Sequence, residues 1–130
     1  MLNMKTHELT PNSGVELRKE NRFVLLLDIT NKRCALSIGP TSHYLHEQAV
    51  NDHLNNPKKY LKIAGFYTPI TKQASVTGIN DLPITTNDAH AKAGLKLLFE
   101  AFKHHNITLE TIHPNEEHGN IPAITRRDLD

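Results

Sequence analysis

The stretch that decides the fold is FVLLLDITNKRCALS, residues 23–37. Its first five residues, from Phe23 to Leu27, are all apolar and do not alternate with polar ones. A strand with this pattern needs cover on both faces, which is typical of the centre of a sheet rather than of its edge. A second apolar run, from Cys34 to Ile38, follows at hairpin distance. We therefore expect a hairpin over residues 22–38 whose first strand, residues 22–29, is central.

The apolar run stops at Asp28, and Thr30 and Asn31 behind it favour a turn. A central strand that brings one carboxylate to its C-terminal end is a common way to hold a metal ion or a phosphate group. An aspartate that ends a strand and stabilises the following turn is equally common at such a place. Both interpretations of Asp28 stand on the sequence.

Composition narrows the class of protein. A chain of 130 residues is long enough for one domain with a single core. Its 15 lysines and arginines against 14 acidic residues give a net charge of +1, so no global field indicates a nucleic-acid or membrane partner. One cysteine excludes a disulfide framework, and no apolar run approaches membrane-spanning length. We expect a cytoplasmic protein that does not enter a membrane.

The rest of the chain alternates between helix and strand signals. Thr41 or Ser42 begins a helix toward Leu54, or a short strand over 42–46 precedes a helix that starts near Glu47. The later segments are a strand at 60–67, a polar connection at 68–86 with a short strand at 74–79, a helix at 87–105 that Asn106 stops, and a strand at 107–112. This order predicts the α/β class, with helices packed against a mixed sheet. The expected divisions are a flexible leader at 1–21, a single domain at 22–118 and a short polar tail at 119–130.

The ends of the predicted strands carry most of the polar side chains that suit a site. A strand–helix–strand passage normally makes its two strands parallel, and ligands collect beyond the carboxyl ends of parallel strands. Asp28, Thr68 and residues 115–117 all follow predicted strands. We therefore expect them at one edge of the sheet, around a metal or phosphate site. Gly65 removes a side chain within its strand, where a neighbour or a ligand comes close.

DITNKRCALS, residues 28–37, resembles the D-x-G-T-K-R-I-G-V-A signature of the YqgF-type putative Holliday-junction resolvases and ribosomal-RNA precursor nucleases. IAGFYTP, residues 63–69, is similar to that family's strand ending in V-G-x-P, and residues 115–117 are similar to its D-E-R. The resemblance covers roughly residues 22–118 and implies an RNase H-like fold.

The same resemblance implies metal-assisted hydrolysis of phosphodiesters in structured or branched nucleic acid, with Mg²⁺ or Mn²⁺ held by carboxylates. Asp28 is then a catalytic residue and metal ligand, and Glu116 is the second, with Glu117 as the alternative metal ligand in its place. Lys32 and Arg33 bind the phosphates of the substrate.

Two departures from the family pattern support an alternative. Thr30 replaces the glycine of the motif, and Asn115 replaces its later aspartate. The alternative is a catalytically inactive RNase H-like domain that serves as a protein-binding or assembly module. Leu97, on the far side of the last helix, and an exposed sheet edge then suggest a homodimer.

The nine histidines do not combine into a clear metal site. His46 and His53 share a helix face but lie about 10 Å apart, which is too far for one ion. We expect partly buried, hydrogen-bonded histidines in this helix. His113 and His118 flank the candidate acids, where either can act as a proton donor or remain solvated.

Overall fold

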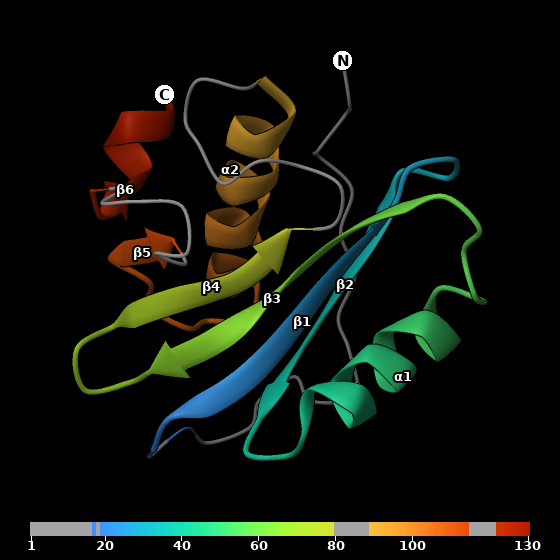
Figure 1. Ribbon diagram of the computed structural model, residues 1–130, viewed down its shortest axis with the longest axis horizontal. Coiled ribbons are helices and arrows are strands. Elements are labelled where there is room, and N and C mark those ends of the chain that lie inside the picture. Colours follow the sequence, from blue (N-terminus) through green and yellow to red (C-terminus); the bar gives the residue numbers. More distant parts are fainter. Residues whose placement is uncertain (1–16, 18, 80–88, 115–121) are drawn as a thin grey trace.

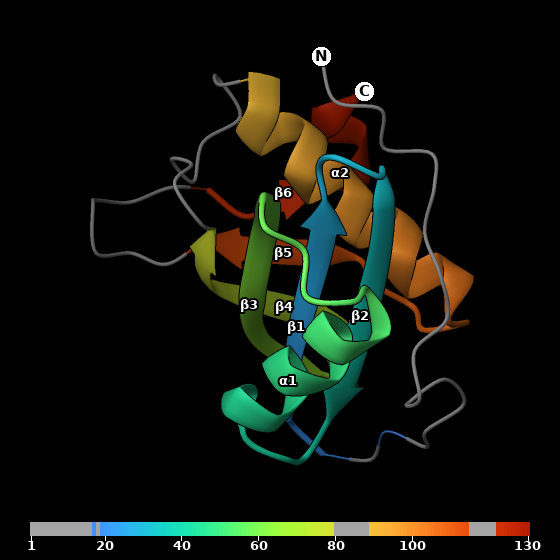
Figure 2. The same cartoon turned by 90° about the vertical axis from the view of Figure 1, so that its right-hand side faces the viewer.

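The computed structural model describes residues 17, 19–79, 89–114 and 122–130. In this part of the chain, a six-stranded mixed sheet has one α-helix on each face (Figures 1 and 2). The elements in chain order are β1 (Asn21–Asp28), β2 (Arg33–Gly39), α1 (His43–His53), β3 (Tyr60–Thr68), β4 (Gln73–Ile79), α2 (Ala89–His104), β5 (Thr111–Pro114), β6 (Ile124–Thr125) and a 3₁₀ helix, η2 (Arg126–Leu129). The predicted α/β class with a mixed sheet is confirmed.

The strands follow the order β2-β1-β3-β4-β5-β6. β1 is antiparallel to both of its neighbours, with Leu25 opposite Leu36 on β2 and Ile63 on β3. β4 and β5 are parallel and are joined through α2, so the strand–helix–strand passage is confirmed. β5 then pairs with β6 in the antiparallel direction.

β1 is covered on both faces, as its unbroken apolar run predicts. Phe23, Leu25 and Leu27 belong to the large core under α2, and each is at most 1% exposed. Val24 and Leu26 point to the opposite face and pack with Val50 and Leu54 at the end of α1. The interior position of the predicted central strand is confirmed.

α1 begins where Ser42 predicts it. The Ser42 side chain accepts a hydrogen bond from the Leu45 N–H (3.4 Å), which satisfies one of the free donors of the first turn. The alternative of a short strand over residues 42–46 is therefore wrong.

Both described helices end at an asparagine in the left-handed region. Asn106 has φ 60°, and its N–H donates to the Lys103 carbonyl (3.0 Å) while the Ile107 N–H donates to the Phe102 carbonyl (2.9 Å). This is a Schellman motif, which occupies carbonyls that the helix leaves free. Asn55 takes the equivalent place after α1, also with φ 60°.

The predicted strand at 107–112 is displaced. Pairing covers only Thr111–Pro114, because the residues before it have other partners: Ile107 completes the cap of α2, and the Glu110 N–H donates to the Lys72 carbonyl (2.8 Å). The connection at 68–86 begins as a hairpin between β3 and β4, and the short strand predicted at 74–79 is confirmed.

The C-terminal segment is not the polar tail that the sequence predicts. Ile124 and Leu129 are each 3% exposed and join the core cluster that contains Leu97. In Figure 1 the red helical turn, η2, accordingly lies beside α2. Leu97 itself is 0% exposed, so its assignment to a homodimer interface is wrong. No helix in the described ranges has the length and apolar character needed to cross a membrane.

Candidate functional site

Asp28 lies at the end of β1 and is 1% exposed. Its Oδ1 accepts hydrogen bonds from the N–H groups of Thr30 (3.1 Å) and Asn31 (3.2 Å), and its Oδ2 accepts one from the Asn31 side chain (2.8 Å). The carboxylate therefore organises the turn between β1 and β2, which confirms the turn interpretation. A role for Asp28 as a catalytic metal ligand stays a prediction.

The other residues of the predicted site divide into two groups. Lys32 is exposed in the turn with φ 55°, and Arg33 is half-buried directly opposite Asp28 in the strand pairing. Both therefore share the hairpin end with Asp28. Glu116 and Glu117, together with Asn115 and His118, lie outside the described residues.

The directions of the strands place Asp28 and Thr68, which we expected at one edge of the sheet, at opposite ends of it. Because β1 and β3 are antiparallel, Thr68 lies at the opposite end of the sheet from Asp28, and the expectation of one shared edge is wrong for Thr68. Pro114, at the end of β5, is level with Phe23 through Val76 and Gly65. Three strand spacings place β5 roughly 14 Å from β1, and Asp28 lies roughly 17 Å further along the strand direction than Phe23.

The histidine of α1 that matters most for packing is His46, which is 1% exposed. Its Nδ1 is 2.7 Å from the Ser37 Oγ, and its Nε2 lies within hydrogen-bond distance of Thr41 Oγ1 (2.9 Å) and the Gly39 carbonyl (3.2 Å). Burial lowers the pKa of His46 below 6.5, although the hydrogen bond to Gly39 opposes this shift. The expectation of a buried, hydrogen-bonded histidine is confirmed. In the described part of the chain, no three His, Cys, Asp or Glu side chains gather as a metal site would require.

A surface that the sequence interpretation missed lies on the α1 side of the sheet. α1 packs over β1 and β2, and leaves β3, β4 and β5 without a helix among the described elements (Figure 1). Alternation places Tyr60 and Lys62 on this side near α1, and eight further residues that we call the open face: Ala64, Phe66, Thr68, Gln73, Ser75, Thr77, Thr111 and His113. Ser75 and Thr77 are exposed and the others are half-buried. No residue of β3, β4 or β5 is acidic.

Phe66 lies at one end of the open face, between two cationic or titratable side chains. The guanidinium carbon of Arg22, on β1, is 5.5 Å from the centre of the Phe66 ring. The His43 ring, at the start of α1, is 5.1 Å from the same ring at an angle of 79°. His43 Nε2–H donates to the Gly65 carbonyl (2.9 Å), which fixes the imidazole beside Phe66. We call these three side chains the Arg22–Phe66–His43 cluster.

Gly65 permits the local geometry of this cluster. The register between β3 and β4 shifts between Ala64 and Gly65, and a Cβ at Gly65 would lie 2.0 Å from the Ser75 carbonyl oxygen. The close neighbour that the sequence predicts at Gly65 is thus the backbone of β4. This irregularity lies directly before Phe66.

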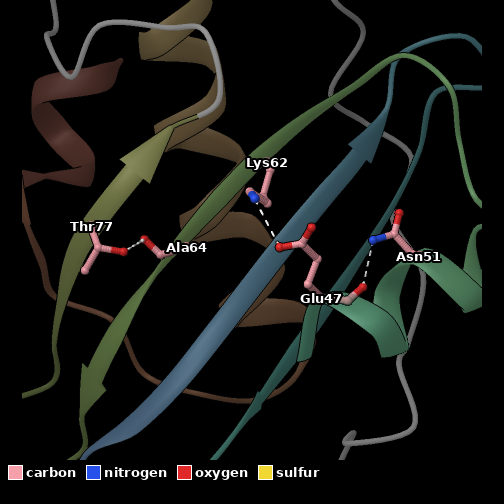
Figure 3. A network of polar contacts seen from close by, with 5 residues as sticks. All are labelled: Glu47, Asn51, Lys62, Ala64 and Thr77. Atoms are coloured by element: carbon pink, nitrogen blue, oxygen red, sulfur yellow. Dashed lines mark hydrogen bonds and ion pairs between the residues drawn. The ribbon is translucent and has the colours of Figure 1, made fainter. Parts of the chain in front are cut away.

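Glu47 on α1 is neutralised by a lysine of β3 (Figure 3). Its Oε1 accepts a hydrogen bond from Lys62 Nζ (3.0 Å), and the Asn51 side chain donates to its backbone carbonyl (2.9 Å). Thr77 donates to the Ala64 carbonyl (3.0 Å), linking β4 to β3 on the same side (Figure 3). Arg22 forms no ion pair with another described residue, so its charge beside Phe66 is not neutralised in this part of the chain.

Comparison with models of protein families, with curated proteins and with solved structures finds no match to this chain. The resemblance to the YqgF-type family therefore stays a prediction.

Proposed function

We propose that this protein binds single-stranded nucleic acid on the open face of its sheet, with the Arg22–Phe66–His43 cluster as the anchor. The observation that supports this most strongly is a half-buried aromatic ring on a part of the sheet face that no described helix covers, flanked by an arginine 5.5 Å and a histidine 5.1 Å from its centre. Aromatic side chains with nearby cations are the common means of holding unpaired bases and their phosphates.

The chemistry of the surrounding strands suits the same partner. The hydroxyl groups of Thr68, Ser75 and Thr111 can bond phosphate, sugar or base edges, and none of the three strands carries a carboxylate that repels phosphate. A double helix does not expose base faces for stacking on Phe66, so an unpaired strand fits this surface better.

Cleavage is a separate prediction. The nuclease interpretation requires Asp28 with Glu116 or Glu117 around Mg²⁺ or Mn²⁺, and Lys32 and Arg33 on the substrate. Asp28 is buried and its two oxygens accept three hydrogen bonds within the turn, which supports a binding role for the protein over a catalytic one. The inactive RNase H-like module remains the closest of the sequence hypotheses, with nucleic acid as its partner.

Fluorescence anisotropy with labelled 12-nucleotide DNA and RNA strands tests the proposal. Phe66→Leu keeps an apolar side chain and removes the stacking surface, so we expect its affinity to fall roughly tenfold, since stacking contributes about 1–3 kcal/mol per base. Tyr60→Leu is the matched control, because it removes an aromatic ring from the same strand and the same side at the far end of β3. Equal affinity of the wild type and Phe66→Leu would refute the proposal.

The same samples decide the question of cleavage. Incubation of branched and single-stranded substrates with Mg²⁺ or Mn²⁺ should leave them intact if the protein only binds. Cleavage that disappears in Asp28→Asn would instead establish the nuclease. Self-association without any binding of oligonucleotide would favour the assembly module.

A further inference from the structure

A hollow lies on the α2 side of the sheet, away from the open face. It measures about 430 Å³ and lies between the C-terminal turn of α2, residues 106–109 and the start of η2. Its apolar lining comes from Phe99, Ile107 and Leu109. Two cationic side chains, Lys103 and Arg126, complete it together with the polar Asn106 and Thr108.

The walls of this hollow are fixed by hydrogen bonds, although residues 107–110 form neither helix nor strand. The Ile107 N–H donates to the Phe102 carbonyl in the last turn of α2, and the Thr108 carbonyl accepts a hydrogen bond from the Tyr67 hydroxyl. Ile107 and Leu109 also pack against the main core. The apolar part of the hollow is therefore formed before any ligand arrives.

Arg126 is held at the rim by the geometry of η2. The residue before it, Thr125, donates from both its N–H (2.8 Å) and its hydroxyl (3.1 Å) to Asp128 Oδ2. This capping box fixes the first turn of η2, where Arg126 is the first residue. The backbone of Arg126, from which the guanidinium extends, is thus held in this turn beside α2.

Both cations are without an acidic partner in the described ranges. The ion pairs found there join Lys62 to Glu47, Lys72 to Glu110 and Lys96 to Asp130. No residue that lines the hollow is acidic. The carbonyls of Ala101, Phe102 and Lys103 near the end of α2 already accept backbone hydrogen bonds. The hollow therefore offers two positive charges beside an apolar floor.

We propose that this hollow binds a small amphipathic carboxylate, with an aromatic or branched aliphatic body on Phe99, Ile107 and Leu109 and its carboxylate on Arg126 and Lys103. A guanidinium matches a carboxylate with two parallel hydrogen bonds, and lysine adds a point charge. The volume is that of a small-molecule site. A bare phosphate leaves the apolar floor in contact with water and so uses only half of the lining.

Titration of the ¹⁵N-labelled full chain with 2-naphthoate tests this proposal by NMR. We expect saturable shifts of the amide signals of residues 103–109 and 126. 2-Naphthamide has the same ring without the charge, and acetate has the charge without the ring, so each should bind at least tenfold more weakly. Equal binding of 2-naphthamide would overturn the proposal. So would the absence of a saturable shift with 2-naphthoate up to about 10 mM, a concentration at which even weak ligands bind.

Two neighbouring arginines provide a matched pair of variants. Arg126→Gln removes the guanidinium at the rim, and we expect the dissociation constant for 2-naphthoate to rise roughly tenfold because a charge-assisted bidentate contact is lost. Arg127→Gln removes the same charge one residue later, outside the lining, and should change the constant less than twofold. Equal effects of the two variants would mean that only the general positive charge matters, and would contradict the site.

Discussion

At the scale of single residues, two glycines show how close packing decides what a position tolerates. Gly65 faces the backbone of β4, whereas Gly94 on α2 faces the ends of two flexible side chains, Leu61 Cδ2 at 3.0 Å and Ile63 Cδ1 at 3.4 Å. Backbone atoms in a paired sheet have no room to withdraw, but side-chain ends do. The same substitution should therefore have very different costs at the two positions.

We predict that Gly65→Ala lowers the free energy of unfolding by about 1–3 kcal/mol or more, because its Cβ overlaps the Ser75 carbonyl. Gly94→Ala should stay within about 1 kcal/mol of the wild type, since the gain of roughly 1 kcal/mol in helix propensity offsets a small shift of Leu61. Urea unfolding followed by circular dichroism measures both. An unchanged free energy of unfolding in Gly65→Ala would contradict the close contact between position 65 and the Ser75 carbonyl.

His46 makes the stability of the protein depend on acid. Its folded-state pKa is lowered by burial, so below the unfolded-state value of about 6.5 the unfolded chain binds a proton that the folded chain does not. The free energy of unfolding should therefore fall as the pH decreases from about 6.5 toward the folded-state pKa. His43 lies nearby and shifts the pKa in the same direction.

His46→Gln tests this dependence. At pH 7.5 the variant should be less stable by about 1–3 kcal/mol, because Ser37 and Thr41 lose a buried partner. Its further loss of stability between pH 7.5 and pH 5.5 should be smaller than that of the wild type, as judged from urea midpoints. His104→Gln, at an exposed histidine, serves as the control. If His46→Gln lost as much stability between pH 7.5 and pH 5.5 as the wild type, the pH dependence would come from other groups.

At the scale of elements, asparagine ends both described helices in a conformation that glycine adopts more easily. Asn55 and Asn106 both have φ 60°, and a non-glycine residue in this region is strained, asparagine least. We predict that Asn106→Gly keeps or raises the stability by up to about 1 kcal/mol, and that Asn106→Ala lowers it by roughly 1 kcal/mol. Thermal unfolding of the two variants checks this, and equal melting temperatures would contradict the role of Asn106 as the left-handed cap of α2.

The elements that the sequence predicts best are those whose pattern has one physical meaning. The unbroken run at Phe23–Leu27 indicates an interior strand, and Ser42 and Asn106 mark helix ends by their hydrogen-bonding and backbone preferences. Ile107 and Leu109 misled the prediction because alternate apolar residues also suit an extended segment that packs on the core without pairing. Ile124 and Leu129 lie five positions apart in a mostly polar segment, so no periodic pattern predicts that this segment enters the core.

The candidate site was harder to predict because its parts come from three separate elements. Asp28 stands out in the sequence as a charge after an apolar run, but its hydrogen bonds are local to one turn. Arg22, His43 and Phe66 are up to 44 positions apart, and only the pairing of β1 with β3 and the placement of α1 bring them together. The feature that could have indicated this surface is the alternation of buried and half-buried positions along Tyr60–Thr68, which is typical of a strand with one face toward solvent.

At the scale of the whole molecule, the net charge of +1 is small, but the acidic residues are distributed unevenly over the elements. Acidic residues are absent from β3, β4 and β5, while Glu47 beside the open face is paired with Lys62. We predict modest, salt-dependent binding of single strands: with about two phosphate contacts, affinity should fall roughly 5–10-fold between 50 and 200 mM salt. Anisotropy titrations at several salt concentrations measure this slope, and a flat response would point to a protein partner instead.

Mapping a single-stranded oligonucleotide onto the ¹⁵N-labelled protein by chemical shift tests the central claim most directly. We predict that the perturbed amides gather on the start of β1, on β3 and β4 and on the start of α1, around residues 22, 43, 66, 75 and 77, while the turn at 28–33 stays unchanged. Perturbations centred on Asp28, Lys32 and Arg33, or none at all, would contradict the assignment of nucleic-acid binding to the open face.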